Sequence, residues 1–238
     1  MPDKRQHRGP NPRDRQLFAP QSVLTLQQAA ADYCTLLDMG YPKDASLKLV
    51  GDRFELKQRQ RMAIARSSCT AEEAEARRQK EVPANQIDGR LEIDGFNLLI
   101  TVESALSGGV IIIGRDGAYR DIASQHGTFH SVAETGPALN LIGKRLADAG
   151  PILWLLDRPV SNSGRLKQQM LEIAANHSWD WQVELVQNPD EELRRSTSTI
   201  VSADSVILDH CDSWVNLAKA IIHESIPDAQ IVEIARQD

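Results

Sequence analysis

The sequence predicts an α/β protein, with a mainly parallel, three-layer α/β/α sandwich preceded by a small all-α, helix-turn-helix-like domain. Residues 91–234 alternate short apolar runs with amphipathic helical patterns, which is typical of a parallel sheet covered by helices. Residues 22–86 carry helical patterns without a strand pattern. The chain has 238 residues and is 41% hydrophobic, so it can bury a sizeable core.

The N-terminal part is expected to be an arm followed by three helices. Residues 1–20 contain several prolines and predict an extended arm. Helices are expected at 22–39, at 45–50 and from residue 56 onward, with Gly40 and Gly51 ending the first two. The third helix carries four basic residues that could contact nucleic-acid phosphates, although a solvated basic face is the other interpretation; they are Lys57, Arg59, Arg61 and Arg66.

A polar helix and linker at residues 70–86 predict the domain boundary. The expected units are the arm (1–20), a helical, mildly basic domain (21–86) and an α/β domain (87–238). Net charge is −6 and is unevenly distributed, at +4 for residues 1–86 and −10 for residues 87–238. This asymmetry suits an anion or nucleic-acid contact in the first part and cation binding in the second, or two ordinary solvated surfaces.

The α/β domain is expected to alternate strands and helices along its length. Turn residues at 115–117 predict a hairpin, and residues 125–135 predict a loop. Strands are expected at 91–93, 110–113, 119–122, 152–156, 181–186, 199–201 and 230–234, and helices at 97–106, 135–149, after residue 164, at 189–195 and around 214–222.

Three of these strands end on an aspartate, namely Asp94, Asp157 and Asp204. Because the carboxyl ends of parallel strands share one edge of a sheet, we expect the three side chains to meet there. Clustered carboxylates suit Mg²⁺ or Mn²⁺, which can activate water, although an aspartate after a strand can also simply cap the next helix. An acidic helix just before the last strand offers candidates for a fourth ligand: Asp190, Glu191 and Glu192.

The segment Asp94-Gly95-Phe96-Asn97 resembles the DGYN signature of the NYN branch of the PIN-like nuclease superfamily, with Phe96 in place of tyrosine. The later order of a strand ending in Asp157, an acidic helix and Ser202-Ala203-Asp204 is also similar to that Rossmann-like fold. The resemblance covers roughly residues 88–234 and implies that the aspartates bind metal and that Asn97 orients the site or contacts substrate. The whole chain is also similar to a conserved family of unknown function.

Two further groups of polar residues are candidates for ligand contacts. The loop residues Arg158, Ser161, Asn162 and Ser163 could bind a phosphate, or could form only a loop and helix cap. The hairpin region could form a lid, although surface placement is the default expectation for its members Arg115, Arg120, His126 and His130.

Cysteine usage and hydropathy predict a cytoplasmic protein. Cys34, Cys69 and Cys211 are odd in number and far apart, which indicates reduced thiols and excludes a disulfide framework. No apolar run is long enough to span a bilayer, so no membrane partner is expected. A homo-oligomer is compatible with the sequence.

The leading functional hypothesis is a metal-dependent nuclease, a ribonuclease or related phosphodiesterase, acting on RNA or another nucleic acid. One alternative is a non-enzymatic nucleic-acid-binding or regulatory protein with a degenerate nuclease fold. Another is an α/β enzyme that binds a nucleotide or phosphometabolite through the loop at 158–163.

Overall fold

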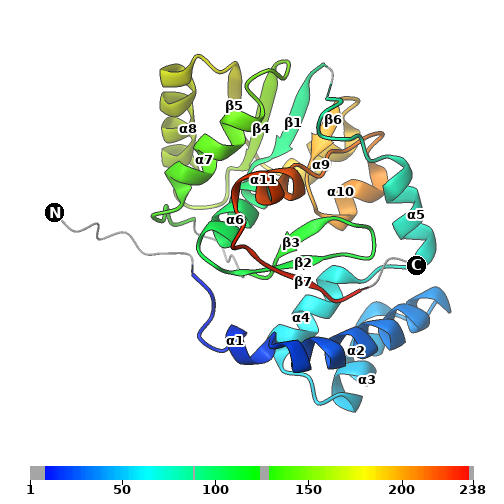
Figure 1. The fold of residues 1–238 in the computed structure, drawn as a ribbon. Coiled ribbons are helices and arrows are strands. Elements are labelled where there is room, and N and C mark those ends of the chain that lie inside the picture. The colour runs from blue at the N-terminus through cyan, green and yellow to red at the C-terminus, as the bar shows by residue number, and fades with distance from the viewer. Residues whose placement is uncertain (1–8, 88, 124–128, 236–238) are drawn as a thin grey trace.

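The computed structural model describes residues 9–87, 89–123 and 129–235. Eleven helices and seven strands lie within these residues (Figure 1). The helices are α1 (Asp14–Leu17), α2 (Pro20–Asp38), α3 (Lys43–Arg53), α4 (Gln58–Ser67), α5 (Ala71–Gln79), α6 (Gly95–Leu106), α7 (Thr135–Arg145), α8 (Ser163–His177), α9 (Pro189–Arg195), α10 (Ser205–His210) and α11 (Leu217–Ser225). The strands are β1 (Leu91–Asp94), β2 (Val110–Ile113), β3 (Tyr119–Asp121), β4 (Ile152–Asp157), β5 (Trp181–Val186), β6 (Thr199–Val201) and β7 (Gln230–Glu233).

Four strands form a fully parallel sheet in the order β5-β4-β1-β6. Side chains alternate between its two faces. One face, which includes Ile93 and Trp154, shares a core with α6, α7 and α8. The other face, which includes Leu155 and Ile200, packs against α9 and α10. This part of the protein is therefore the three-layer α/β/α arrangement that the sequence predicts.

The remaining strands form a second sheet in the order β3-β2-β7, so the expected three-layer sandwich includes only four of the seven strands among the described residues. Strand β2 pairs parallel with β7 and antiparallel with β3. Strand β1 already has β4 and β6 as neighbours, so β2 cannot pair with it. Ile111 belongs to the core around α6, whereas Val110 and Ile112 point to the N-terminal helices. Strand β2 is buried on both faces only because those helices cover the second of them.

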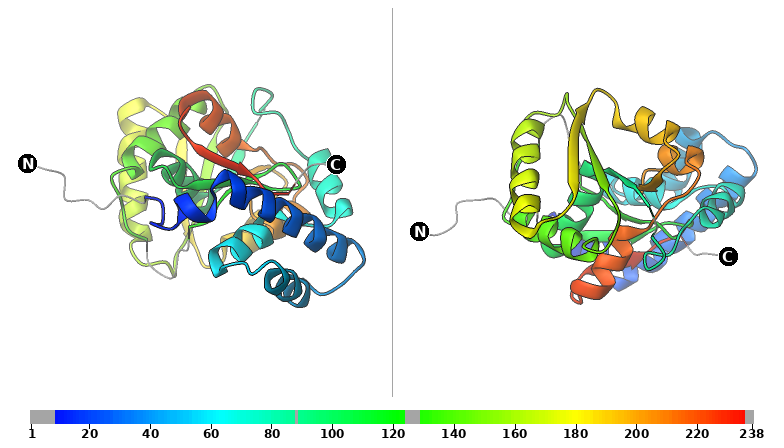
Figure 2. Two further views of the ribbon diagram at one scale, coloured as in Figure 1. Left: turned by 60° about the horizontal axis from the view of Figure 1, so that its bottom comes forward. Right: turned by 90° about the horizontal axis from the view of Figure 1, so that it is seen from above.

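The N-terminal helices share their core with this second sheet and do not enclose one of their own. Leu26 of α2 and Ile64 of α4 lie in one cluster with Ile112, Val232 and Ile234. Figure 2 shows α2 lying across this sheet, far along the chain from the strands that it covers. A separate all-α domain is therefore not confirmed. In the part of the chain that the structure describes, no helix is both long and apolar enough to cross a membrane.

Several local expectations also need correction. The arm expected to be extended contains α1, and α10 has no counterpart among the expected helices. Gly51 does not end a helix but lies inside α3, where an added Cβ would come 2.4 Å from Cζ of Arg61. The last long helix begins at Leu217, because the fully buried Trp214 instead forms β-bridges to Glu81 and Ile200.

Gly95 allows α6 to begin directly against β4. A Cβ at this position would lie 2.5 Å from Leu156 Cδ2 and 2.9 Å from the backbone oxygen of Leu155. We expect Gly95→Ala to lower the free energy of unfolding by about 1–3 kcal/mol, as overpacking usually does, measured by chemical denaturation. The matched control is Gly164→Ala in α8, where nothing lies within 4 Å of the added Cβ. A Gly95→Ala protein as stable as this control would contradict the close-approach argument.

Candidate functional site

The structure brings the three strand-end aspartates to one edge of the four-stranded sheet. Strand β1 lies between β4 and β6, and Asp94 is level with Leu155 of β4. Asp157 ends β4, and Asp204 follows β6 as the N-cap of α10. The edge is therefore formed by carboxylates from neighbouring strands, as expected from their positions in the sequence.

Asp94 is the most buried of these carboxylates, with 7% of its surface exposed. Its Oδ1 accepts from the backbone N–H of Asn97 at 3.4 Å as a helix cap, and its Oδ2 accepts from Ser202 Oγ at 2.9 Å. Burial, together with the negative charges of Asp190 and Asp204, raises the pKa of Asp94 to about 7, although the Ser202 hydrogen bond opposes the rise.

The acidic helix contributes Asp190 to the same electrostatic environment. Partial shielding of its carboxyl from water raises the pKa of Asp190, and the charges of Asp204 and Asp157 raise it further. Burial likewise raises the pKa of Asp157. By contrast, Glu191 pairs with Arg195 at 2.5 Å on the outside of α9. Of the three acidic candidates on this helix, which include the exposed Glu192, Asp190 is therefore the one coupled to the strand-end aspartates.

The chemistry of this edge suits a hard divalent cation. Carboxylate oxygens are the ligands that Mg²⁺ and Mn²⁺ prefer, and a cation would offset both the burial and the repulsion that raise the pKa values of Asp94 and Asp190. As the side chains are placed, no group of three or more His, Cys, Asp or Glu among the described residues is arranged to hold a metal ion. Binding would therefore require the carboxyl groups to move closer together.

The loop that carries Asp204 is held by contacts from both sides. Asn97 Oδ1 accepts from the backbone N–H of Ala203 at 2.9 Å, and Ser202 Oγ accepts from the N–H of Asp204 at 3.0 Å. On the other side, Arg120 Nε donates to the carbonyl of Ala203 at 2.7 Å. Asn97 and Arg120 therefore fix the position of Asp204 relative to Asp94.

Two family models match the chain. One, described as "Domain of unknown function (DUF5616)", matches residues 84–220, more than half of the chain. The chain belongs to the DUF5616 family. The other, described as "Protein of unknown function (DUF434)", matches residues 25–80. The expected similarity to a family of unknown function is thereby confirmed, and the candidate carboxylates all lie in the DUF5616 segment, residues 84–220.

A relative from Methanocaldococcus jannaschii, "Uncharacterized protein MJ0935", is 28% identical over 187 residues. The match covers 78% of this chain and 89% of the relative. No solved structure matches the chain significantly.

The loop proposed for phosphate binding uses its polar groups internally. Asn162 Nδ2 donates to the carbonyl of Phe129 at 2.9 Å, and the carbonyl of Ser161 accepts from the N–H of Phe129 at 3.0 Å. Arg158 donates to the carbonyl of Leu185, and Ser163 is buried at the start of α8. This loop therefore holds the segment at Phe129, whose ring packs against Phe96 with centroids 5.4 Å apart.

The arginines of the basic helix also make internal contacts. Arg59 pairs with the fully buried Asp14, with nitrogen–oxygen distances of 2.5 and 2.8 Å. Arg61 donates to Asp52 at 2.7 Å, and Arg66 donates to the carbonyls of Asp121 and Ala123. Of the four residues proposed for nucleic-acid contact, Lys57 and Arg66 are exposed, at the start and near the end of α4. The three arginines connect the helix to the rest of the protein.

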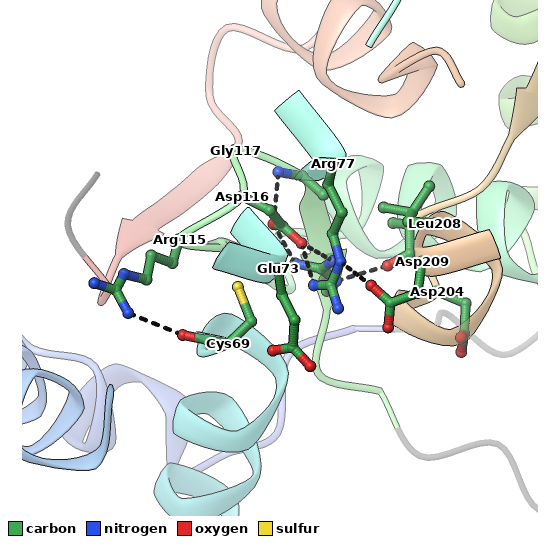
Figure 3. Close-up of polar contacts among 12 residues, drawn as sticks. Cys69, Glu73, Arg77, Arg115, Asp116, Gly117, Asp204, Leu208 and Asp209 are labelled. Carbon is green, nitrogen blue, oxygen red and sulfur yellow. Dashed lines mark hydrogen bonds and ion pairs between the residues drawn. The ribbon is translucent and has the colours of Figure 1, made fainter. Parts of the chain in front are cut away.

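A buried ion network joins the two family segments, and sequence reasoning missed it. Arg77 of the DUF434 segment, residues 25–80, donates to Asp116 at 2.8 Å and to Asp209 at 2.7 Å (Figure 3). Asp116 also accepts two hydrogen bonds from Arg120. Although burial opposes its ionisation, the charges and hydrogen bonds of Arg120 and Arg77 lower the pKa of Asp116 to about 2. Asp116 therefore remains ionised inside the protein.

The expectation that Arg115 and Arg120 of the hairpin region lie on the surface is wrong. Arg115 and Arg120 are 7% and 9% exposed, because the hairpin lies between the N-terminal helices and α10. Arg115 donates to Asp38 and to the carbonyl of Cys69. His130 is exposed, and His126 lies outside the described residues. A run of alternating charges in a short hairpin, Arg-Asp-Gly then Arg-Asp, was the available signal for this internal pairing.

Proposed function

We propose that the protein is a divalent-metal-dependent hydrolase of phosphodiesters, a nuclease, with its reaction centre at the carboxylate edge of the four-stranded sheet. The observation that carries the proposal is the convergence of the strand-end carboxylates Asp94, Asp157 and Asp204 at one edge of the sheet. Burial, together with the negative charges of Asp190 and Asp204, raises the pKa of Asp94 to about 7. Carboxylates held in this way outside a cation site destabilise the folded protein, so their convergence favours a cation as the missing partner.

The roles follow from the contacts already described. Asp94, Asp190 and Asp204 would hold Mg²⁺ or Mn²⁺, with Asp157 beside them. Such an ion activates water and stabilises the charge that develops on a phosphodiester. Ser202 orients Asp94 through its hydroxyl, and Asn97 holds the loop of Asp204 through Ala203. The resemblance to NYN nucleases adds the substrate class, RNA or another nucleic acid.

The two alternative functions have less support. A non-enzymatic nucleic-acid-binding protein would use the basic face of α4, but Arg59 and Arg61 are occupied by internal acceptors, which leaves Lys57 and the exposed Arg66 on that helix. A phosphate site in the loop at 158–163 would need donors from Arg158 and Asn162, but Arg158 donates to the carbonyl of Leu185 and Asn162 donates to the carbonyl of Phe129.

We expect Asp94→Asn to reduce Mn²⁺-dependent cleavage of labelled single-stranded RNA on the order of 100-fold, about 2.7 kcal/mol of transition-state stabilisation. The matched control is Asp228→Asn, an exposed carboxylate after α11 and remote from this edge in sequence. A second readout is thermal unfolding, in which Mn²⁺ should raise the midpoint of the wild type and of the control but not of Asp94→Asn. Equal cleavage by all three proteins, or none by the wild type with Mn²⁺, would exclude this function.

A further inference from the structure

A cleft of about 460 Å³ lies between the DUF434 and DUF5616 segments. Lys43 and Arg66 lie on the side of the N-terminal helices, and Asn97 and Asp204 lie on the side of the carboxylate edge. Its volume is in the range of pockets that hold small ligands, about 300–1,000 Å³. Because Asp204 lines it, the cleft leads directly to the proposed reaction centre.

Arg77 also lines this cleft and has an unused donor. Its side chain is 2% exposed, and its Nε and Nη1 are bound to Asp209 and Asp116. Its Nη2 is buried and has no hydrogen-bond partner. A buried donor without a partner is costly and uncommon in folded proteins, so an acceptor that entered the cleft would satisfy this nitrogen.

The charges around the cleft nearly balance, which restricts the kind of acceptor. Lys43, Arg66, Arg77 and Arg120 line it together with Asp121 and Asp204. Behind this lining, Asp116 and Asp209 pair with the buried arginines (Figure 3). Glu73 Oε1 lies 3.4 Å from Lys43 Nζ. The cleft therefore recognises a ligand through directed donors and not through a strong positive field. A singly charged phosphodiester fits this balance better than a doubly charged phosphomonoester.

Part of the lining is apolar and suits a sugar or base. Phe96 and Ile100 of α6 and Ala65 of α4 contribute to it, and Asn97 of α6 also lines the cleft. Asn97 uses its Oδ1 to hold Ala203, which leaves its amide nitrogen as a further donor. Apolar contact combined with a few placed donors is the usual composition of a nucleotide-sized site.

We propose that this cleft holds one nucleotide of a single-stranded nucleic-acid chain next to the carboxylate edge, with its phosphodiester bound by Arg77 and Arg66. This inference rests on the proposed nuclease function and specifies how the substrate is held. It also gives the DUF434 segment a role, because Lys43, Arg66 and Arg77 all come from that segment.

The test measures fluorescence anisotropy of a labelled eight-nucleotide single-stranded RNA with the full chain in EDTA at low salt. Two variants act at the rim, because Arg77 variants would also break two buried ion pairs. Arg66→Glu reverses a lining charge, and Ala65→Trp fills the cleft from an exposed position of α4. The control is Lys57→Glu, the same kind of charge change at the start of the same helix but outside the cleft.

We expect Kd to rise at least tenfold for Arg66→Glu and Ala65→Trp, and less than threefold for Lys57→Glu. Free mononucleotides at millimolar concentration should not displace the RNA. Unchanged binding by both cleft variants, an equal loss in the control, or displacement of the RNA by millimolar mononucleotides would overturn the proposal.

The binding assay contains EDTA and no metal, so it tests RNA binding in the cleft independently of metal-dependent cleavage. If the cleft variants cleaved RNA as well as the wild type in the presence of metal, the proposed role of the cleft would be rejected and the proposed nuclease function would be retained. If the cleft variants weakened RNA binding but the wild type showed no metal-dependent cleavage, the proposed role of the cleft would be supported and the proposed nuclease function would be rejected.

Discussion

Replacing Asp116 by alanine is expected to lower the free energy of unfolding by about 3–5 kcal/mol, the usual cost of removing one member of a buried charge pair. Asp116 is 1% exposed and is shared by the guanidinium groups of Arg77 and Arg120. Its removal leaves two buried cations without their common counter-ion. Urea denaturation of the wild type and of Asp116→Ala measures the difference in free energy of unfolding.

The control for this experiment is Asp52→Ala. Asp52 also accepts from two cations, Lys48 and Arg61, but it lies on the surface, where such pairs contribute little. The midpoint of this variant should stay close to that of the wild type. If Asp116→Ala were as stable as Asp52→Ala, the network would not be the element that joins the two family segments.

The same network gives a second, more specific result. Replacing Arg120 by methionine in the Asp116→Ala background removes one of the two orphaned charges, so it should recover part of the lost stability. Arg120→Met alone should be destabilising, because it leaves Asp116 with fewer partners and frees the carbonyl of Ala203. The resulting double-mutant cycle measures the coupling between the two side chains.

The second large effect is expected in the pH dependence of stability in metal-free buffer. The pKa of Asp94 is about 7 in the folded protein and about 3.9 in the unfolded chain. The folded state therefore binds this proton more tightly, and stability is lost as pH rises from about 4 to about 7. Each unit corresponds to about 1.4 kcal/mol, so the full loss over about three units is about 4 kcal/mol.

Asp94→Asn removes this loss. We expect the variant to gain roughly 2–3 kcal/mol relative to the wild type between pH 5 and pH 8, measured by urea denaturation in EDTA. Asp228→Asn, which changes an exposed carboxylate, should follow the wild-type profile. Parallel profiles for Asp94→Asn and the wild type would show that Asp94 ionises normally in the folded protein.

The placement of the candidate carboxylates could be predicted from the sequence because it depends on short-range rules. An apolar run of four to six residues followed by an aspartate predicts a buried strand with a polar end, and parallel pairing brings such ends to one edge. Asp94, Asp157 and Asp204 lie at that edge for this reason. The choice of Asp190 over Glu191 and Glu192 was left open, because it depends on which side of α9 faces the sheet.

The basic helix illustrates the opposite case. The sequence places four positive charges near one another, but it does not indicate where their partners are. Asp14 lies 45 residues from Arg59, and Asp121 lies 55 residues from Arg66. A charge pattern predicts a basic face only when the fold supplies no acceptors, and here it supplies one for each arginine.

The sequence by itself determined which segments become strands and helices across most of the chain, and which aspartates end the central strands, because both depend on local periodicity. Only the tertiary structure decided that the strands divide into two sheets and that the N-terminal helices cover the second. The tertiary structure also decided that Arg77, Asp116 and Arg120 form a buried network beneath the cleft. These features depend on contacts between residues far apart in the chain, whose free energies come from burial and charge pairing in the assembled core.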